Sequence, residues 1–142
     1  MLAQETIISI SEDGTAWTPI GCITSYSIEQ SERNEIETTC LSATEKTFKL
    51  GLRDPGTMSL DLEYEQDSTG QGMLEDSYAS DDSYHFKIEY NNAPSGGTPG
   101  EKTFEGYVSA LSETGSVDDL ITESVSIRVT GNVTNTDPAP AP

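Results

Sequence analysis

The sequence predicts a mainly β protein, a sandwich or small barrel of antiparallel strands with one flanking α-helix. Three observations predict this class. Apolar residues occur in short runs in which they alternate with polar residues, the side-chain period of a strand with one buried face. Gly, Pro, Asn and Asp separate these runs, and a single stretch has helical spacing. The length of 142 residues suits one domain with one hydrophobic core.

Three strands are expected in the N-terminal part of the chain. Residues 6–11 alternate clearly and end in a turn, and Trp17 and Pro19 lead into the next strand. Residues 20–30 form that long strand, with weak sidedness, and residues 34–40 follow after a short polar turn. We therefore expect the segments 20–30 and 34–40 to pair as a hairpin.

Residues 41–55 have too few apolar residues in phase for a core element, but they hold three of the seven cations of the chain, Lys46, Lys49 and Arg53. The clearest strand of the sequence comes next. One of its faces is apolar and consists of Met58, Leu60, Leu62 and Tyr64. The other face consists of Ser59, Asp61, Glu63 and Glu65. This strand therefore has one core face and one acidic face.

The stretch with helical spacing is 70–82, in which the inward positions are expected to be Met73, Leu74, Tyr78 and Ala79. Three more strands follow, at 84–90, 102–111 and 123–131. In the last of them we expect Val125, Ile127 and Val129 to face the core. The final residues are rich in proline, which cannot donate a backbone hydrogen bond, so they predict a loose, extended tail.

The net charge is −18, from 7 Lys and Arg against 25 Asp and Glu. Proteins that bind duplex DNA or anionic membranes need cations, so the charge argues against both functions. No run approaches the roughly 18 apolar residues of a membrane span. The first residues show neither the basic nor the apolar part of a secretion signal, so we expect Cys22 and Cys40 to be reduced.

The sequence contains no convincing catalytic or metal-binding motif. Residues 96–103 superficially resemble a P-loop, but Glu101 stands where that motif requires glycine and would repel phosphate. Residues 67–70 lack the ligand series of a calcium loop, and His85 is the only histidine, too few for a zinc site or a hydrolytic triad. We therefore expect no enzyme activity, no metal and no cofactor.

Polar strands with unpaired edges can pair with other chains and aggregate, and symmetric association of copies removes such edges. Three segments support an assembly role, because they occur in the order typical of one family: WTPIGCITSYSI at 17–28, EIETT at 35–39, and GLRDPG at 51–56 running into MSLDL at 58–62. In this order they resemble the major tail tube protein of long, non-contractile-tailed (siphovirus, lambda-like) bacteriophages. The resemblance covers residues 1–132 as a tail tube domain and leaves 133–142 as an extended tail.

The resemblance implies a virion protein that is made in the host cytoplasm and assembles as hexameric rings. The rings would stack into a tube, with inner strands merged into one β-barrel through which duplex DNA passes without specific binding. Tape measure, tail terminator and tip proteins are the further partners that the family implies. The loop 41–55 is expected to reach the next ring, with candidate contacts Lys46, Lys49, Leu52, Arg53 and Asp54.

Two acidic strand faces are candidates for the channel wall. One is Glu35 with Glu37, and the other is the face of Ser59, Asp61, Glu63 and Glu65. Exposure of either face on the outer wall is the alternative. Two other functions remain open at this point, a monomeric adhesin or carbohydrate-binding β-sandwich and an acidic DNA mimic, and both would stay small in solution.

Overall fold

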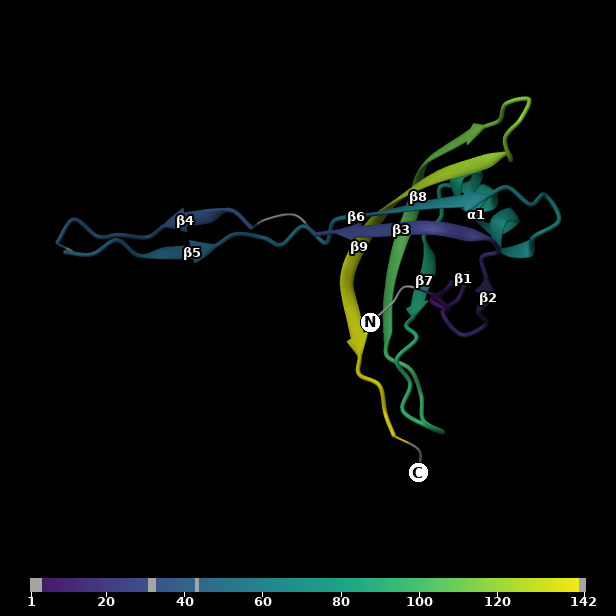
Figure 1. Cartoon of the computed structure of the whole chain (residues 1–142). Coiled ribbons are helices and arrows are strands. Elements are labelled where there is room, and N and C mark those ends of the chain that lie inside the picture. Colours follow the sequence, from purple (N-terminus) through teal and green to yellow (C-terminus); the bar gives the residue numbers. More distant parts are fainter. Residues whose placement is uncertain (1–3, 31–32, 43, 141–142) are drawn as a thin grey trace.

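The computed structural model describes residues 4–30, 33–42 and 44–140 (Figure 1). The expectations for the first three residues, for residues 31–32 of the polar turn, for residue 43 of the loop and for residues 141–142 of the tail lie outside these ranges. The described residues form nine strands and one helix. They are β1 (Ile7–Ser11), β2 (Thr18–Pro19), β3 (Ile23–Glu29), β4 (Glu35–Glu37), β5 (Phe48–Leu50), β6 (Thr57–Glu63), α1 (Thr69–Ser80), β7 (Tyr84–Glu89), β8 (Glu101–Thr114) and β9 (Thr122–Thr136).

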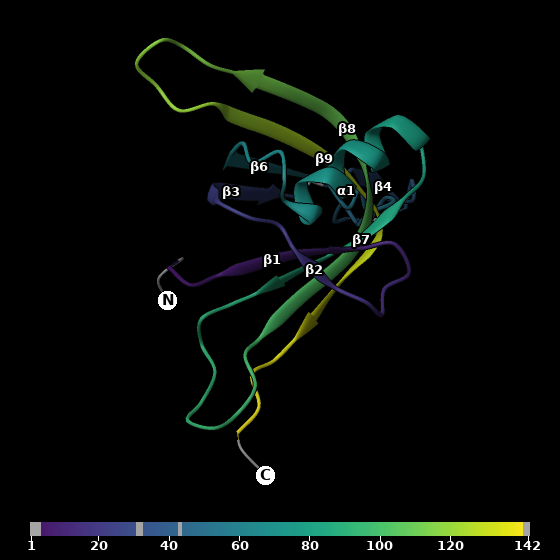
Figure 2. The same cartoon turned by 90° about the vertical axis from the view of Figure 1, so that its right-hand side faces the viewer.

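Seven strands form one antiparallel sheet in the order β2-β1-β7-β8-β9-β6-β3, and β4 pairs only with β5. Figure 2 shows that the large sheet curls into a half-barrel with α1 lying against it. The long strands β8 and β9 run through both halves of the curl and hold it together. The predicted class, antiparallel β with one flanking helix, is confirmed.

The concave side of the curled sheet holds the core, as the alternation predicts. Met58, Leu60 and Leu62 of β6 are buried, and so are the inward residues of β9. Further buried apolar side chains come from β1, β7, β8, α1 and the residue after β2: Ile8, Ile10, Phe86, Ile88, Phe104, Leu74 and Ile20. Removal of this apolar surface from water is the main stabilising term of the fold.

Helix α1 packs through a face that only partly matches the one its spacing predicts, because Leu74 is buried and Met73 packs against the core as expected, but Tyr78 and Ala79 do not. Its buried residues are Gly70, Gln71, Leu74 and Ser77, whereas Tyr78 is about half exposed, at 51%, and Ala79 is exposed. Gly70 lies so close to the backbone that an added Cβ would fall 2.3 Å from the carbonyl oxygen of Pro19. The helix therefore approaches the sheet through its smallest residue, which a search for apolar residues overlooks.

The expected hairpin of 20–30 with 34–40 is wrong. Strand β3 pairs instead with β6, because its half-buried Tyr26 and Ile28 join the core there. Strand β4 has a single apolar residue and pairs with β5. Within the segment 33–55, the described residues 33–42 and 44–55 thus form a long two-stranded arm that projects from the body (Figure 1). We call this segment the arm.

The C-terminal strand is longer than predicted. Strand β9 continues to Thr136, beyond the expected end at residue 131 and into the expected tail of 133–142. Gly131, with a φ of 77°, interrupts its alternation, which is why the sequence pattern ends there. After the strand, Ala139 and Thr98 exchange two backbone hydrogen bonds of 2.9 and 3.1 Å, so this part of the tail is tied to the loop before β8.

Candidate assembly surfaces

The convex side of four strands forms one continuous polar surface, which we call the polar face. It belongs to β3, β6, the first half of β9 and the second half of β8, and register places its residues in rows across the sheet. Its members are Ser25, Ser27, Glu29, Thr57, Ser59, Asp61, Glu63, Tyr107, Ala110, Ser112, Thr114, Thr122, Ser124, Ser126 and Arg128. All of them are exposed or half-buried, and most carry a hydroxyl group.

Asp61 lies in the middle of the polar face and is held by its neighbours. Ser25 Oγ donates to one carboxylate oxygen at 3.0 Å, and Ser124 Oγ donates to the other at 2.8 Å. Thr24 adds a hydrogen bond of 3.0 Å to the backbone carbonyl of Asp61. The two hydroxyl donors come from β3 and β9, so three strands together hold this carboxylate in place on the polar face.

Both edges of the four-stranded surface are unpaired within the described chain. Strand β3 is the last strand of the sheet. On the other side, β7 pairs only with residues 101–106 of β8, so residues 107–114 present a second strand edge. Unpaired edges are templates for another strand, and here the two edges belong to the same antiparallel surface.

The arm carries exposed apolar side chains on an element without a core. Phe48 and Leu50 lie opposite Glu37 and Glu35 on one face, and Ile36 lies opposite Lys49 on the other. Phe48, Leu50 and Ile36 are each more than half exposed. Backbone hydrogen bonds maintain the pairing beyond the strands, such as the bond of 2.8 Å from the amide of Thr38 to the carbonyl of Thr47.

The root of the arm is bonded to β9. Arg53 donates to the side-chain oxygen of Asn132 at 2.9 Å. Arg128 Nη2 lies 2.7 and 2.8 Å from the two carboxylate oxygens of Asp54. Of the five inter-ring candidates, Lys46, Lys49 and Leu52 are therefore free to project, whereas Arg53 and Asp54 contact their own body.

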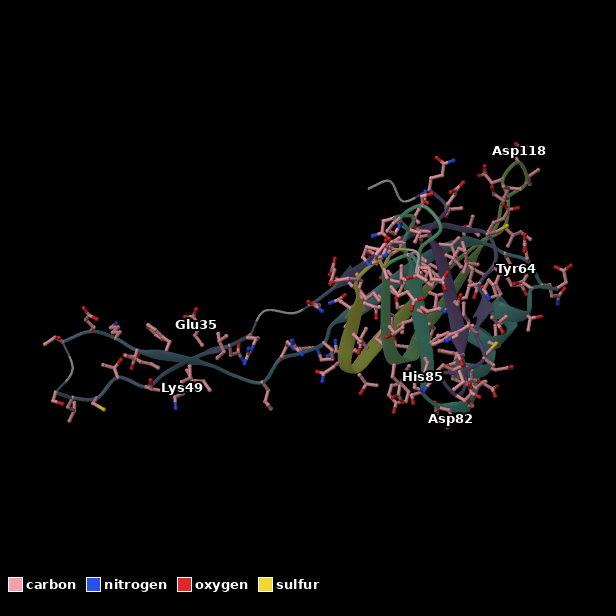
Figure 3. The ribbon with its side chains drawn as sticks, turned by 90° about the horizontal axis from the view of Figure 1, so that it is seen from below. Glu35, Lys49, Tyr64, Asp82, His85 and Asp118 are labelled. Carbon is pink, nitrogen blue, oxygen red and sulfur yellow. The ribbon has the colours of Figure 1, made fainter. Side chains whose placement is uncertain are left out.

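The structure brings only some of the predicted channel residues together. Ser59, Asp61 and Glu63 share the polar face, but β6 ends at Glu63, and Glu65 turns toward α1. There its carboxylate accepts a hydrogen bond of 2.7 Å from Cys22 Sγ, a contact that raises the pKa of the thiol. Glu35 and Glu37 lie on the arm, where Figure 3 labels Glu35 and Lys49 far from the body.

Sequence reasoning missed the hydroxyl residues of β3 and β9 and the cation Arg128. The signal was present, because Ser25 and Ser27 alternate with Tyr26 and Ile28, as Ser124 and Ser126 alternate with valine and isoleucine. The sequence alone does not show that β3, β6 and β9 lie side by side. Pairing decides which alternating faces add up to one surface.

A second group of carboxylates lies on the core side near α1. Glu123 is only 5% exposed and lies directly opposite Glu113 of β8. Burial, followed by the charges of Glu75 and Glu113, raises the pKa of Glu123. The same three carboxylates, after burial, raise the pKa of Tyr64. Within the described residues, no group of His, Cys, Asp and Glu side chains is arranged to hold a metal ion.

A curled sheet with one polar face, two open edges and a projecting arm defines a structural subunit of a larger assembly. The described residues include no helix long and apolar enough to cross a membrane. The chain belongs to the family of lambda-like phage tail tube proteins, whose model matches residues 1–138. It is a structural protein of the virion tail, not an enzyme.

Individual relatives agree with this assignment. Structural protein 3 of Pseudomonas phage PAJU2 is 29% identical over 128 residues, which cover 78% of this chain and 77% of that protein. The tail tube subunit of SPP1 has the same fold, with a TM-score of 0.78 at 12% identity, covering 96% of this chain and 79% of that one. The tail of an empty GTA particle, refined with C6 symmetry, gives a TM-score of 0.73 at 11% identity over 96% and 98% of the two chains.

Proposed function

We propose that six copies of this chain close into a ring, that rings stack into the tail tube, and that the polar face lines the channel for duplex DNA. The observation that carries the proposal is the pair of open edges on one polar, four-stranded surface. Edge β3 of one copy would pair with residues 107–114 of β8 in the next. Ring closure by this contact leaves neither of these two edges open.

The strand number fits a wide channel. Four strands from each of six copies make a barrel of about 24 strands, and barrels beyond about 16–18 strands leave an aqueous channel. The sixfold count comes from the family resemblance and agrees with the C6 symmetry of the GTA tail. A channel of this kind can admit a duplex, which a single subunit cannot enclose.

The chemistry of the polar face suits passage without binding. Its surface is mostly Ser and Thr hydroxyls, with negative charge from Glu29, Asp61 and Glu63. Carboxylates release no counterions from DNA, and screening over about 8 Å confines their repulsion to the wall. DNA would therefore slide. Glu35 and Glu37, on the arm, would face a neighbouring ring instead.

The arm would provide the contact between rings. Lys46 and Lys49 offer positive charge to a strongly acidic neighbour, and Phe48 and Leu50 offer apolar surface. We propose that the tube domain extends to Thr136, since β9 does, and that the following residues are the tail. Tape measure, terminator and tip proteins are the partners proposed at the two ends.

The assembly itself is tested by light scattering and electron microscopy of purified protein at rising concentration and with a tail initiator complex. Rings or tubes with a central channel are expected. A stable monomer under all conditions would overturn the proposal and favour an adhesin-like module or an acidic DNA mimic.

The channel assignment is tested by adding two lysines to each of two surfaces. Ser59→Lys with Glu63→Lys places cations on the polar face, while Glu35→Lys with Glu37→Lys places them on the arm as a matched control. In assembled virions, the first pair should retain DNA in a salt-dependent manner and the second should not. Normal DNA ejection from normal tails of the first variant would place the polar face outside the channel.

A further inference from the structure

The polar face holds one basic residue, Arg128. Cations in the wall of a DNA channel would bind phosphates and slow the passage of DNA. The sequence has seven Lys and Arg residues, all within the described ranges. Four lie on the arm, and Lys87 and Lys102 lie in the other half of the sheet. Arg128 alone lies in a row of the polar face, between Thr57 of β6 and Tyr107 of β8.

Arg128 is half exposed, but its guanidinium already makes hydrogen bonds within its own chain. Its side chain is 50% exposed, so its guanidinium is within reach of solvent on this face. One of its terminal nitrogens, Nη2, contacts both oxygens of Asp54, at 2.7 and 2.8 Å, and the other, Nη1, donates to Thr57 Oγ1 at 3.4 Å. An arginine fork recognises phosphate with the same N–H groups that it uses for a carboxylate. Bound in this way, the positive charge of Arg128 is compensated by Asp54, and the N–H groups of Nη2 are already used.

The position of Asp54 is prepared by the local backbone. Its Oδ1 accepts a hydrogen bond of 2.9 Å from the amide of Gly56, which places the carboxylate beside β9. Gly56 has a φ of 99°, and a Cβ at this position would fall 1.7 Å from the carbonyl oxygen of Glu29. Only glycine permits this turn. The carboxylate is therefore held in place by the backbone of the arm root, and its contact with Arg128 does not depend on a chance meeting of two mobile side chains.

We propose that Asp54 masks the charge of Arg128, so that the channel wall presents no free cation to the passing DNA. This inference rests on the proposed function, which places the polar face in the channel. With sixfold symmetry, loss of the mask would expose a ring of six arginines in every layer of the tube. Each arginine that reaches a phosphate releases counterions and adds close to one unit to the salt dependence of DNA binding.

The test compares four variants in assembled virions with the wild type. Asp54→Asn leaves Arg128 unmasked, and Asp54→Asn with Arg128→Gln removes both charges. Asp54→Arg with Arg128→Asp reverses the pair and keeps it neutral. Ser126→Arg adds a cation one row away on the same face of β9 and leaves the Asp54 pair intact. Tail formation is followed by electron microscopy, and DNA release is measured from 50 to 200 mM salt.

Asp54→Asn is expected to retain DNA at low salt, with a hold that weakens up to roughly 10³-fold across this range if six arginines engage phosphates. The double substitution and the reversed pair are expected to release DNA as the wild type does. Ser126→Arg should retain DNA.

Normal release by Asp54→Asn, combined with retention by Ser126→Arg, would overturn the masking role while leaving the channel assignment intact. Normal release by both would remove the polar face from the channel and with it the proposed function. If Asp54→Asn folds but builds no tails, while the reversed pair builds them, Asp54 anchors the arm and the masking role is wrong.

Discussion

The large sheet and the arm are both antiparallel β structure, yet different interactions hold them. In the sheet, every strand except the two-residue β2 contributes side chains to one core, and Leu60, Phe86 and Ile127 are almost fully buried. In the arm, β4 and β5 keep their pairing through backbone hydrogen bonds, while Phe48 and Leu50 remain more than half exposed. An isolated two-stranded hairpin is only marginally stable in water. The comparison teaches that the core of the sheet is complete within one chain, whereas the apolar side chains of the arm have no core of their own to enter.

The difference in stability between the sheet and the arm is tested most directly by removing one aromatic ring from each region. Phe86→Ala should lower the free energy of unfolding by about 3–5 kcal/mol, because it leaves a cavity beside the stacked ring of Phe104. Phe48→Ala on the arm should change it by less than about 0.5 kcal/mol. Denaturant unfolding of both variants measures the difference. Equal losses would mean that the arm is part of the same cooperative unit as the core.

Two glycines of α1 test how closely the body is packed. Gly70→Ala should destabilise the protein by about 1–3 kcal/mol, because the new methyl group would collide with the backbone of Pro19 and Ile20. Gly72→Ala, two residues along the same helix, meets no atom within 4 Å and should stabilise by about 0.4–1 kcal/mol. Thermal unfolding separates the two. A stabilising Gly70→Ala would show that the helix is free to shift.

The buried carboxylate of Glu123 makes the stability of the sheet depend on pH, which gives a further test of the difference between sheet and arm. Its raised pKa means that the folded protein binds this proton more tightly than the unfolded chain, so ionised Glu123 opposes folding. The cost is present above the folded pKa and disappears as the pH falls below the ordinary value of about 4.3. Glu123→Gln should therefore raise the unfolding midpoint at pH 7, and this gain should vanish in acid.

The matched control for Glu123 lies on the arm. Glu37 is exposed and makes no contact with the core, so Glu37→Gln should leave the midpoint unchanged at both pH values. A pH-independent gain in Glu123→Gln would instead assign the effect to packing of the neutral side chain.

The smallest effect on folding is expected from the arm cations, together with a large effect on assembly. Lys46→Glu with Lys49→Glu should leave the unfolding midpoint within experimental error, because both side chains are exposed. Tube growth should be lost, since two like-charged rings would meet without compensation. Sedimentation and electron microscopy measure it. Unimpaired growth would exclude the two lysines from the ring contact.

The sequence by itself determined the strands and their buried faces, because alternation is a local property of neighbouring residues. The core face of Met58, Leu60 and Leu62 and the inward residues of β9 were predicted in this way and are confirmed. The family, too, could be recognised from the order of short local segments. Each of these features depends on residues that are close together along the chain.

Only the tertiary structure decided which faces and loops meet. The partner of β3, the burial of Gly70 rather than Tyr78, and the path of Glu65 all depend on elements brought together by packing. Asp54 and Arg128 are 74 residues apart, so no local pattern could connect the arm root to the polar face. The physical reason is that a strand edge accepts any partner of suitable register, and the choice among partners is made by how much apolar surface the whole chain buries.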